Sequence, residues 1–220
     1  MFEQGQTTTT FWAGTFEGEL VLVDWAAKSG RNVGGEGGAA EGGEDKAKPD
    51  NILVCYDQEA NGRPVLCVER SPFYPDLVMT VHDFNFCIWK TSLPYPENTH
   101  PIFKSANSFG SHNTSGGFSP TRPGVIFITK TDAIDVWDFY DQSNKPSITL
   151  PLATSSITYF KFQFLSKGKG KKTWQNQIMS YGEFETGNLD LCEVPLDLSK
   201  EQDKEAEIIR AFWDREQEKC

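Results

Sequence analysis

The sequence predicts an all-β protein, part of a β-propeller, that ends in one α-helix. Short apolar runs bounded by glycine, proline, asparagine and aspartate fill most of the chain, and no helical pattern separates them. Such runs should pair as antiparallel strands. A set of landmarks recurs at one spacing, which indicates a repeated unit of several strands. The closing segment lacks glycine and proline and is rich in helix-forming residues, so it should be helical.

The repeat is marked by landmarks that keep one spacing. They are Ser71 and Ser119, both followed by proline, then Pro75 and Pro123, and finally Trp89 and Trp137, each pair 48 positions apart. Each unit reads as an inner strand, a second strand, a tight turn, a third strand ending in tryptophan, and a fourth strand. Such a unit is one propeller blade, close in length to the roughly 40–45 residues of a WD40 repeat. The Trp-Asp pair at 137–138 is the dipeptide that marks these blades.

Strands are expected along most of the chain. Runs at 11–16 and 19–25 flank Glu17-Gly18, a tight-turn pair that joins them as a hairpin. The further strands are expected at 51–56, 64–69, 77–81, 85–90, 101–105, 116–120, 124–129, 133–139, 147–150, 156–163, 176–181 and 188–194.

Equivalent positions at the ends of third strands give about three and a half blades. They are Trp25, Trp89, Trp137 and Cys192, where cysteine replaces the tryptophan. Because blades bury their faces only against neighbours, the chain should be part of a larger propeller, and it should open in mid-blade. The expected domains are a partial WD blade at 1–27, a Gly/Glu-rich flexible loop at 28–49, WD40 propeller blades at 50–197 and an amphipathic helix at 198–220.

Two polar segments interrupt the strands. The 28–49 segment contains GGEGG, but no Lys-Ser/Thr pair and no helix follow, so we interpret it as a linker rather than a phosphate-binding loop. The 167–172 run, KGKGKK, is basic on an otherwise acidic chain. A solvated loop explains it, and the functional alternative is contact with the acidic surface of a partner.

The C-terminal helix is predicted over 199–219. Ser199 and Gln202 have the spacing of a capping box. An apolar stripe should run along one face of this helix, made by Ile208, Ile209, Phe212 and Trp213. The stripe indicates only that something covers it, so the helix either packs back on its own domain or docks on a partner.

Composition excludes several function classes. The formal net charge of −10 argues against general binding of nucleic acid. No apolar stretch is long enough to span a membrane, and the N-terminus lacks the pattern of a signal peptide. The odd number of cysteines, with no CxxC pair, favours buried free thiols in a reducing compartment.

No enzyme active site is recognisable, and we expect no catalytic residue, cofactor or metal site. The three histidines form no known catalytic motif, and cysteines and histidines lack metal-ligand spacing. His82-Asp83 should serve a structural use, as a surface pair or by holding a turn. A ligand pocket in the central channel is the competing class, but the inner strands offer no histidine and no carboxylate pair to build one.

The blade motifs resemble those of a known family. The segments ERSPFYPDLVMTV, GGFSPTRPGVIFI, GTFEGELVLVDW and NLDLCEVPLDLS follow in the order and spacing found in axonemal dynein intermediate chains with WD repeats. The resemblance covers nearly the whole chain, corresponds to the C-terminal half of such a protein, and is closest to the inner-arm type of the two-headed I1 (f) dynein. The chain departs from the family at 28–49, at the turn 82–84 and in the KGKGKK run, all of them loops.

The resemblance implies a scaffold subunit without ATPase activity, located in the axoneme of a cilium or flagellum and in the cytoplasm before assembly. Its partners would be a dynein heavy-chain tail, other intermediate and light chains, and the doublet microtubule surface. The alternative is a general WD-repeat adaptor of another assembly, such as a ubiquitin ligase or a transport complex. Loop and helix residues are the candidates for partner contact: Phe73, Tyr74, Phe84, Arg122, Lys169, Lys171, Lys172, Phe212 and Trp213.

Overall fold

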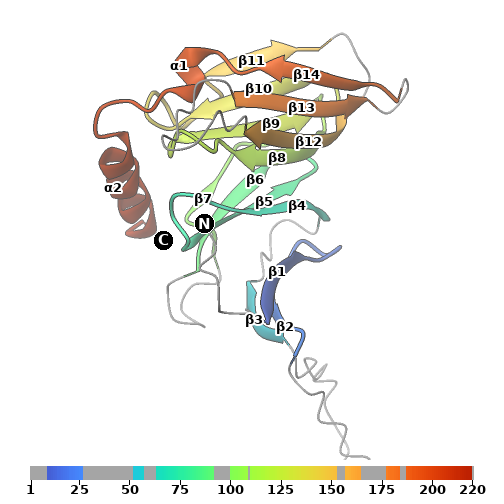
Figure 1. The fold of residues 1–220 in the computed structure, drawn as a ribbon. Helices are drawn as coiled ribbons and strands as arrows, with labels where there is room; N and C mark the ends of the chain where they lie inside the picture. Colours follow the sequence, from blue (N-terminus) through green and yellow to red (C-terminus); the bar gives the residue numbers. More distant parts are fainter. Residues whose placement is uncertain are drawn as a thin grey trace, which may run out of the picture.

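The computed structural model describes residues 9–26, 52–56, 63–91, 100–108, 110–152, 157–164, 177–183 and 187–219. Within these ranges the chain forms antiparallel sheets stacked face to face, and a helix lies across the ends of two of them (Figure 1). The arrangement is a partial WD40 β-propeller with a C-terminal helix, as the repeat predicted. The 28–49 loop and the KGKGKK run both lie outside the described residues.

Each sheet is built from consecutive strands, as in propeller blades. The first sheet contains β1 (Thr10–Gly14), β2 (Leu20–Asp24) and β3 (Ile52–Tyr56), and the second contains β4 (Val65–Arg70), β5 (Leu77–His82), β6 (Phe86–Lys90) and β7 (Phe103–Lys104). The third sheet contains β8 (Asn113–Phe118), β9 (Val125–Lys130), β10 (Ala133–Asp138) and β11 (Ile148–Pro151). The fourth sheet contains β12 (Ile157–Phe164), β13 (Gln177–Glu183) and β14 (Leu189–Glu193). Two helices follow, α1 (Leu196–Ser199) and α2 (Glu205–Gln217).

Apolar side chains pack between each pair of neighbouring sheets. Leu20 and Tyr56 meet Trp89 between the first and second sheets. Between the second and third, Phe86 packs edge-on against Trp137 with ring centroids 5.0 Å apart. Phe127 of β9 meets β12 in the core between the third and fourth sheets. The chain is thus stabilised mainly by burial between blades, as expected of a structure whose units cannot bury their own faces.

The repeated tryptophans lie between blades, as their spacing predicted. Trp89 and Trp137 have exposed fractions of 0% and 5%. The indole N–H of Trp89 donates to Thr80 Oγ1 at 2.9 Å, and this hydroxyl also lies 3.1 Å from Nε2 of the buried His82. Nδ1 of His82 contacts the Arg63 carbonyl. The structural use expected of His82 is therefore confirmed, although its side chain is buried rather than on the surface.

The two Ser-Pro segments form the same type of turn in successive blades. Ser71 Oγ accepts the backbone N–H groups of Phe73 and Tyr74, and Ser119 Oγ accepts those of Thr121 and Arg122. Both turns leave an inner strand and enter a second strand. The shared offset of 48 positions therefore reflects the same hydrogen-bonded turn in successive blades.

Two boundaries differ from the predicted ones by three residues or more. Strand β8 begins at Asn113, three residues before the predicted start, and it ends before Ser119 because the Ser-Pro turn takes over there. The helix begins at Glu205, and the predicted capping box of Ser199 and Gln202 was wrong. Ser199 instead belongs to α1, where its hydroxyl donates to the Leu196 carbonyl.

Three further observations complete the description. Cys67, Cys87 and Cys192 are free thiols, of which only Cys87 is fully buried. Neither described helix is long and apolar enough to cross a membrane. Within the described ranges, no group of three histidine, cysteine, aspartate or glutamate side chains could hold a metal ion.

Candidate interaction surface beside the C-terminal helix

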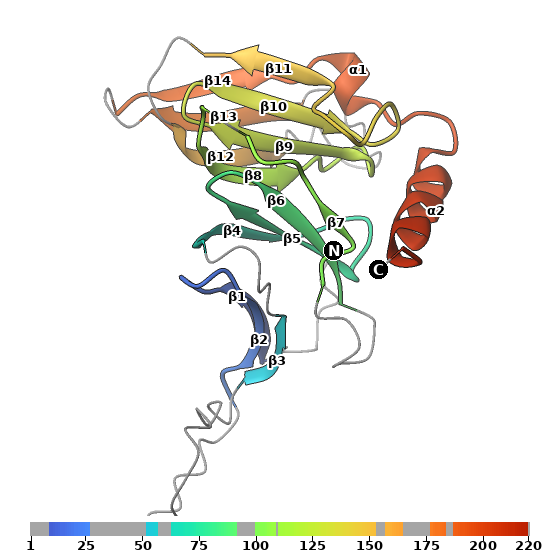
Figure 2. The same cartoon turned by 180° about the vertical axis from the view of Figure 1, so that it is seen from behind.

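Helix α2 packs back on its own domain, which resolves the two alternatives left open by its apolar stripe. Ile209, Phe212 and Trp213 are buried in the core between the second and third sheets. The Trp213 ring lies 4.9 Å from Phe139 by ring centroids. Ile208 points away from this core with an exposed fraction of 46%, so the predicted stripe has three members rather than four. In both ribbon views α2 lies across the same end of the two sheets (Figures 1 and 2).

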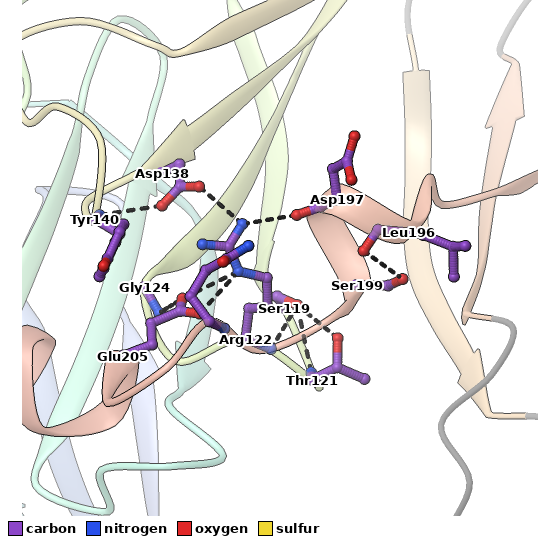
Figure 3. A network of polar contacts seen from close by, with 11 residues as sticks. Ser119, Thr121, Arg122, Gly124, Asp138, Tyr140, Leu196, Asp197, Ser199 and Glu205 are labelled. Carbon is purple, nitrogen blue, oxygen red and sulfur yellow. Dashed lines mark hydrogen bonds and ion pairs between the residues drawn. The ribbon is translucent and has the colours of Figure 1, made fainter.

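A buried ion-pair network fixes the start of α2. Arg122 and Glu205 have side-chain exposures of 2% and 0%, and Arg122 Nε donates to both carboxylate oxygens of Glu205, at 3.1 and 3.0 Å. Arg122 Nη1 pairs with Asp138 at 2.8 Å and donates to the Asp197 carbonyl at 3.0 Å. Figure 3 shows the guanidinium at the centre of this network, between β10, α1 and α2. A single side chain therefore ties three elements together.

The second half of the network uses backbone donors. Glu205 also accepts the N–H groups of Gly124 at 3.3 Å and of Gln202 at 2.8 Å. Burial lowers the pKa of Arg122, but the hydrogen bonds and charges of Glu205 and Asp138 outweigh burial and raise it overall. The positive charge of Arg122 is therefore retained in the folded chain.

Helix α2 contacts equivalent positions of the two Ser-Pro turns. Tyr74 and Arg122, which are 48 positions apart, donate to Ala206 O and Glu205 respectively. Asp76 and Gly124 keep the same offset, and Asp76 forms a bidentate pair with Arg210 at 3.1 and 3.2 Å. We call this set of contacts the helix clasp.

Gly124 lies where α2 packs closely against the turn of the third sheet. A Cβ atom at this position would lie 2.7 Å from Ile209 Cδ1, closer than packed atoms approach. In the other turn the equivalent position, 48 residues earlier, is Asp76, and its side chain pairs with Arg210. The two turns thus share a backbone conformation but contact the helix through different chemistry.

The last turn of α2 is held by a buried lysine. Lys90, at the end of β6, donates to Asp214 Oδ1 at 2.7 Å and to Gln217 Oε1 at 2.6 Å. Its side chain is 8% exposed, and its hydrogen bond lowers the pKa of Asp214. The clasp and Lys90 together therefore hold both ends of the helix.

The predicted partner-contact residues fall into three groups. Tyr74, Arg122, Phe212 and Trp213 make internal contacts with the clasp and the core, since all four are buried. Phe73 and Phe84 are half-buried. Lys169, Lys171 and Lys172 lie outside the described residues. Of the candidates that the structure describes, only the two phenylalanines keep surface open to a partner.

Phe73 lines a groove beside the clasp. The groove has a volume of about 490 Å³ and is formed where the two Ser-Pro turns meet the segment that links α1 to α2. Leu196 is 68% exposed at this groove, an unusual position for a large apolar side chain. The lining residues are Phe73, Pro120, Thr121, Leu196, Ser199, Lys200 and Glu201.

Phe84 lies at the opposite end of the blades, by a smaller cavity of about 240 Å³. Its ring is tilted against that of His112, with centroids 4.8 Å apart, and the Arg63 guanidinium lies 5.2 Å from its centroid. These contacts leave Phe84 less available than the groove residues, so the groove beside the clasp is the stronger candidate for partner contact.

Sequence reasoning missed Glu205, Asp138, Gly124 and Leu196. Glu205 and Asp138 are single acidic residues, and no pattern indicated that they would pair with Arg122. Gly124 carried a signal, since the repeat places it where the other blade has aspartate. Leu196 occurs in a four-residue helix that was too short to be predicted.

The comparisons with known proteins agree on one family. Residues 2–172 match the family model described as dynein axonemal intermediate chain 3 WD40 domain. The human protein named dynein axonemal intermediate chain 3 is 29% identical over 94% of this chain and 20% of its own length. The ciliary dynein intermediate chain 3 of Heliocidaris crassispina is 27% identical over 84% of this chain and 28% of its own length.

A third relative is named for the outer arm. The flagellar outer-arm 70 kDa intermediate chain of Chlamydomonas reinhardtii is 31% identical over 60% of this chain and 23% of its own length. The chain thus spans only 20–28% of the length of these relatives.

The buried pair should dominate the stability of the clasp. Replacing Arg122 by methionine leaves the Glu205 carboxyl group buried without its partner, which should lower the free energy of unfolding by about 3–5 kcal/mol. The matched control is Arg210→Met, which removes an exposed pair and should cost less than about 1 kcal/mol. Urea unfolding followed by tryptophan fluorescence measures both, and equal losses would contradict the network described here.

Tyr74 should make the stability of the folded chain fall at alkaline pH. Burial raises the pKa of Tyr74 to about 12 from 10.0, and the Arg210 charge opposes this shift only in part. Because the pKa is higher in the folded chain, this stabilisation is complete below pH 10 and is lost as the pH rises toward 12. The fall in unfolding free energy over that interval should be smaller in Tyr74→Phe than in the parent chain. An identical fall in both would show that Tyr74 titrates normally.

Proposed function

Since the chain belongs to the axonemal dynein intermediate chains through their WD40 domain, we propose that it is a non-catalytic scaffold subunit of an axonemal inner-arm dynein. In this role the propeller binds the tail of a dynein heavy chain and helps to anchor the motor in the cilium. The ATPase then belongs to the heavy chain. The subunit acts in the axoneme and is present in the cytoplasm before assembly.

The groove beside the clasp is the observation that carries this proposal. A scaffold needs a surface whose shape does not depend on the partner. The helix clasp provides such a surface, because buried ion pairs hold the segment that carries Leu196 and Lys200 against the two Ser-Pro turns. An apolar side chain of a helical tail would fit between Phe73 and Leu196, with Lys200 and Glu201 able to pair with charges beside it.

Placement in the inner arm is the finer part of the proposal. It is supported by the resemblance of the blade motifs to the inner-arm type. The relative named for the outer arm supports the competing placement. Other intermediate and light chains, and the doublet microtubule surface, are the remaining partners that we propose.

Crosslinking mass spectrometry on intact axonemes tests the heavy-chain contact. Lys200 lines the groove, and Lys145 lines the separate, smaller cavity. We expect links from Lys200 to a heavy-chain tail, and fewer from Lys145. The heavy chain that is linked also identifies the arm. Absence of the protein from axonemes, with links to soluble ligase or transport subunits, would overturn the dynein role.

A substitution in the groove gives a matched second test. Leu196→Lys should weaken recovery of the heavy chain with the tagged protein by about tenfold, since it removes an exposed apolar anchor. Leu53→Lys is the control, because Leu53 is also exposed, at 51%, but lies on the first sheet. Equal recovery with both variants would place the contact elsewhere.

A further inference from the structure

The third blade lacks a hydrogen bond that the second blade makes. In the second blade the indole N–H of Trp89 donates to Thr80 Oγ1 at 2.9 Å. The strand register places Trp137 and Ile128 at the equivalent positions, each 48 residues later. Because isoleucine has no hydroxyl group to accept a hydrogen bond, the indole N–H of Trp137 has no partner among the residues that the structure describes.

An ion pair takes the place of the rest of that network. Lys130 and Asp135 stand 48 residues after His82 and Cys87, and their side chains form a salt bridge. Asp135 Oδ1 also accepts the hydroxyl group of Thr149 at 2.6 Å. The side-chain exposures of Lys130 and Asp135 are only 16% and 4%. The two charges therefore balance each other within this blade.

These four positions of the third blade line one cavity between the second and third sheets. It is the smaller cavity that Phe84 also lines, with a volume of about 240 Å³, and its wall on the third sheet includes Ile128, Lys130, Asp135 and Trp137. The two bounding sheets each contain four described strands, so the cavity exists whatever blades adjoin them. Pockets for small molecules usually measure roughly 300–1,000 Å³, so this one has room for a single side chain of a partner.

Asn113 brings a second unpaired polar atom to this cavity. The residue is 4% exposed, and its Nδ2 group donates to the carbonyl oxygens of His82 at 3.0 Å and Asn85 at 3.3 Å. Its Oδ1 atom has no hydrogen-bond partner within the described part of the chain, although Asn113 lines the cavity. Buried polar atoms are nearly always hydrogen-bonded, so an unpaired donor and an unpaired acceptor at one cavity indicate a polar ligand.

We propose that the smaller cavity binds the side chain of a glutamine from a partner protein. The amide carbonyl accepts the indole N–H of Trp137, and the amide NH₂ group supplies the donors that Asp135 and Asn113 can accept. A charged side chain fits less well, because it would meet a like charge at either Lys130 or Asp135. The methylene groups of glutamine pack along the aromatic side chains that line the cavity.

This cavity and the groove beside the clasp are separate sites. They share no lining residue. The proposal therefore goes beyond the dynein role and does not depend on it. A chain that fails to bind a glutamine side chain can still recover the heavy chain, and the reverse also holds.

Nuclear magnetic resonance of the indole N–H groups tests the contact on the 220-residue chain. The probe is N-acetyl-glutamine N-methylamide, and its twins carry glutamate or methionine in place of glutamine. The chain has six tryptophans, and we expect the glutamine probe to move the assigned Trp137 resonance downfield while the others stay in place. The twins should bind at least about tenfold more weakly, since glutamate is repelled by Asp135 and methionine has no donor.

A substitution that restores the hydrogen bond of the second blade gives the matched test. Threonine and valine are similar in shape, but only Ile128→Thr returns a hydroxyl where Thr80 supplies one to Trp89. The new hydroxyl should accept the Trp137 indole N–H and weaken binding of the glutamine probe by about fivefold or more. Ile128→Val shortens the side chain without adding a hydroxyl, and it should leave binding within about twofold of the parent chain.

Several outcomes contradict the proposal. An unmoved Trp137 resonance, or an equal response to the methionine twin, would overturn it, and neither result depends on a variant that folds. Tighter binding of the glutamate twin would assign the cavity to an acidic group, and tighter binding of free glutamine than of the capped probe would assign it to a metabolite, so both results would overturn it. Equal probe binding by Ile128→Thr and Ile128→Val would show that the indole N–H is not the contact.

Discussion

The ion pair between Arg122 and Glu205 is the constraint on which the C-terminal half of the structure depends. Two opposite charges with almost no exposure must remain paired, because an unpaired charge in that position costs several kcal/mol. Arg122 comes from the Ser-Pro turn of the third sheet, and Glu205 begins α2. The pair therefore fixes the position at which α2 starts, and this in turn constrains the path of the segment between α1 and α2.

The other contacts of α2 follow from this fixed starting position. Starting at Glu205, the helix brings Ile209 over Gly124, and Phe212 and Trp213 into the core between two blades. The helix thus covers the end of the blades rather than projecting as a free arm. As a result, the surface offered to partners is the groove beside the clasp, whose shape is held by charges that no partner needs to supply.

Much of the fold could be predicted because it follows from periodic features. The landmarks at 71 and 119 and the tryptophans at 89 and 137 gave the blade length, and burial of Trp89 and Trp137 follows from their place at the ends of third strands. The site was harder to predict. Arg122 was correctly placed in a turn, but it was expected at the surface and is buried. A charged side chain can be buried when an oppositely charged partner is buried beside it, and that partner, Glu205, is distant in the sequence. Phe212 and Trp213 were correctly placed on one face, although the amphipathic pattern alone could not identify what covers that face.

Native-state hydrogen exchange of the α2 amides tests the central claim most directly. If the clasp makes the helix an integral part of the propeller, the amides of 208–217 should exchange only through the same opening, with the same free energy, as those of the buried strand β9. The two sets should also lose protection together as denaturant is added. Helix amides that exchange much faster than β9, with β9 unaffected, would mean that α2 detaches by itself, and would contradict the account.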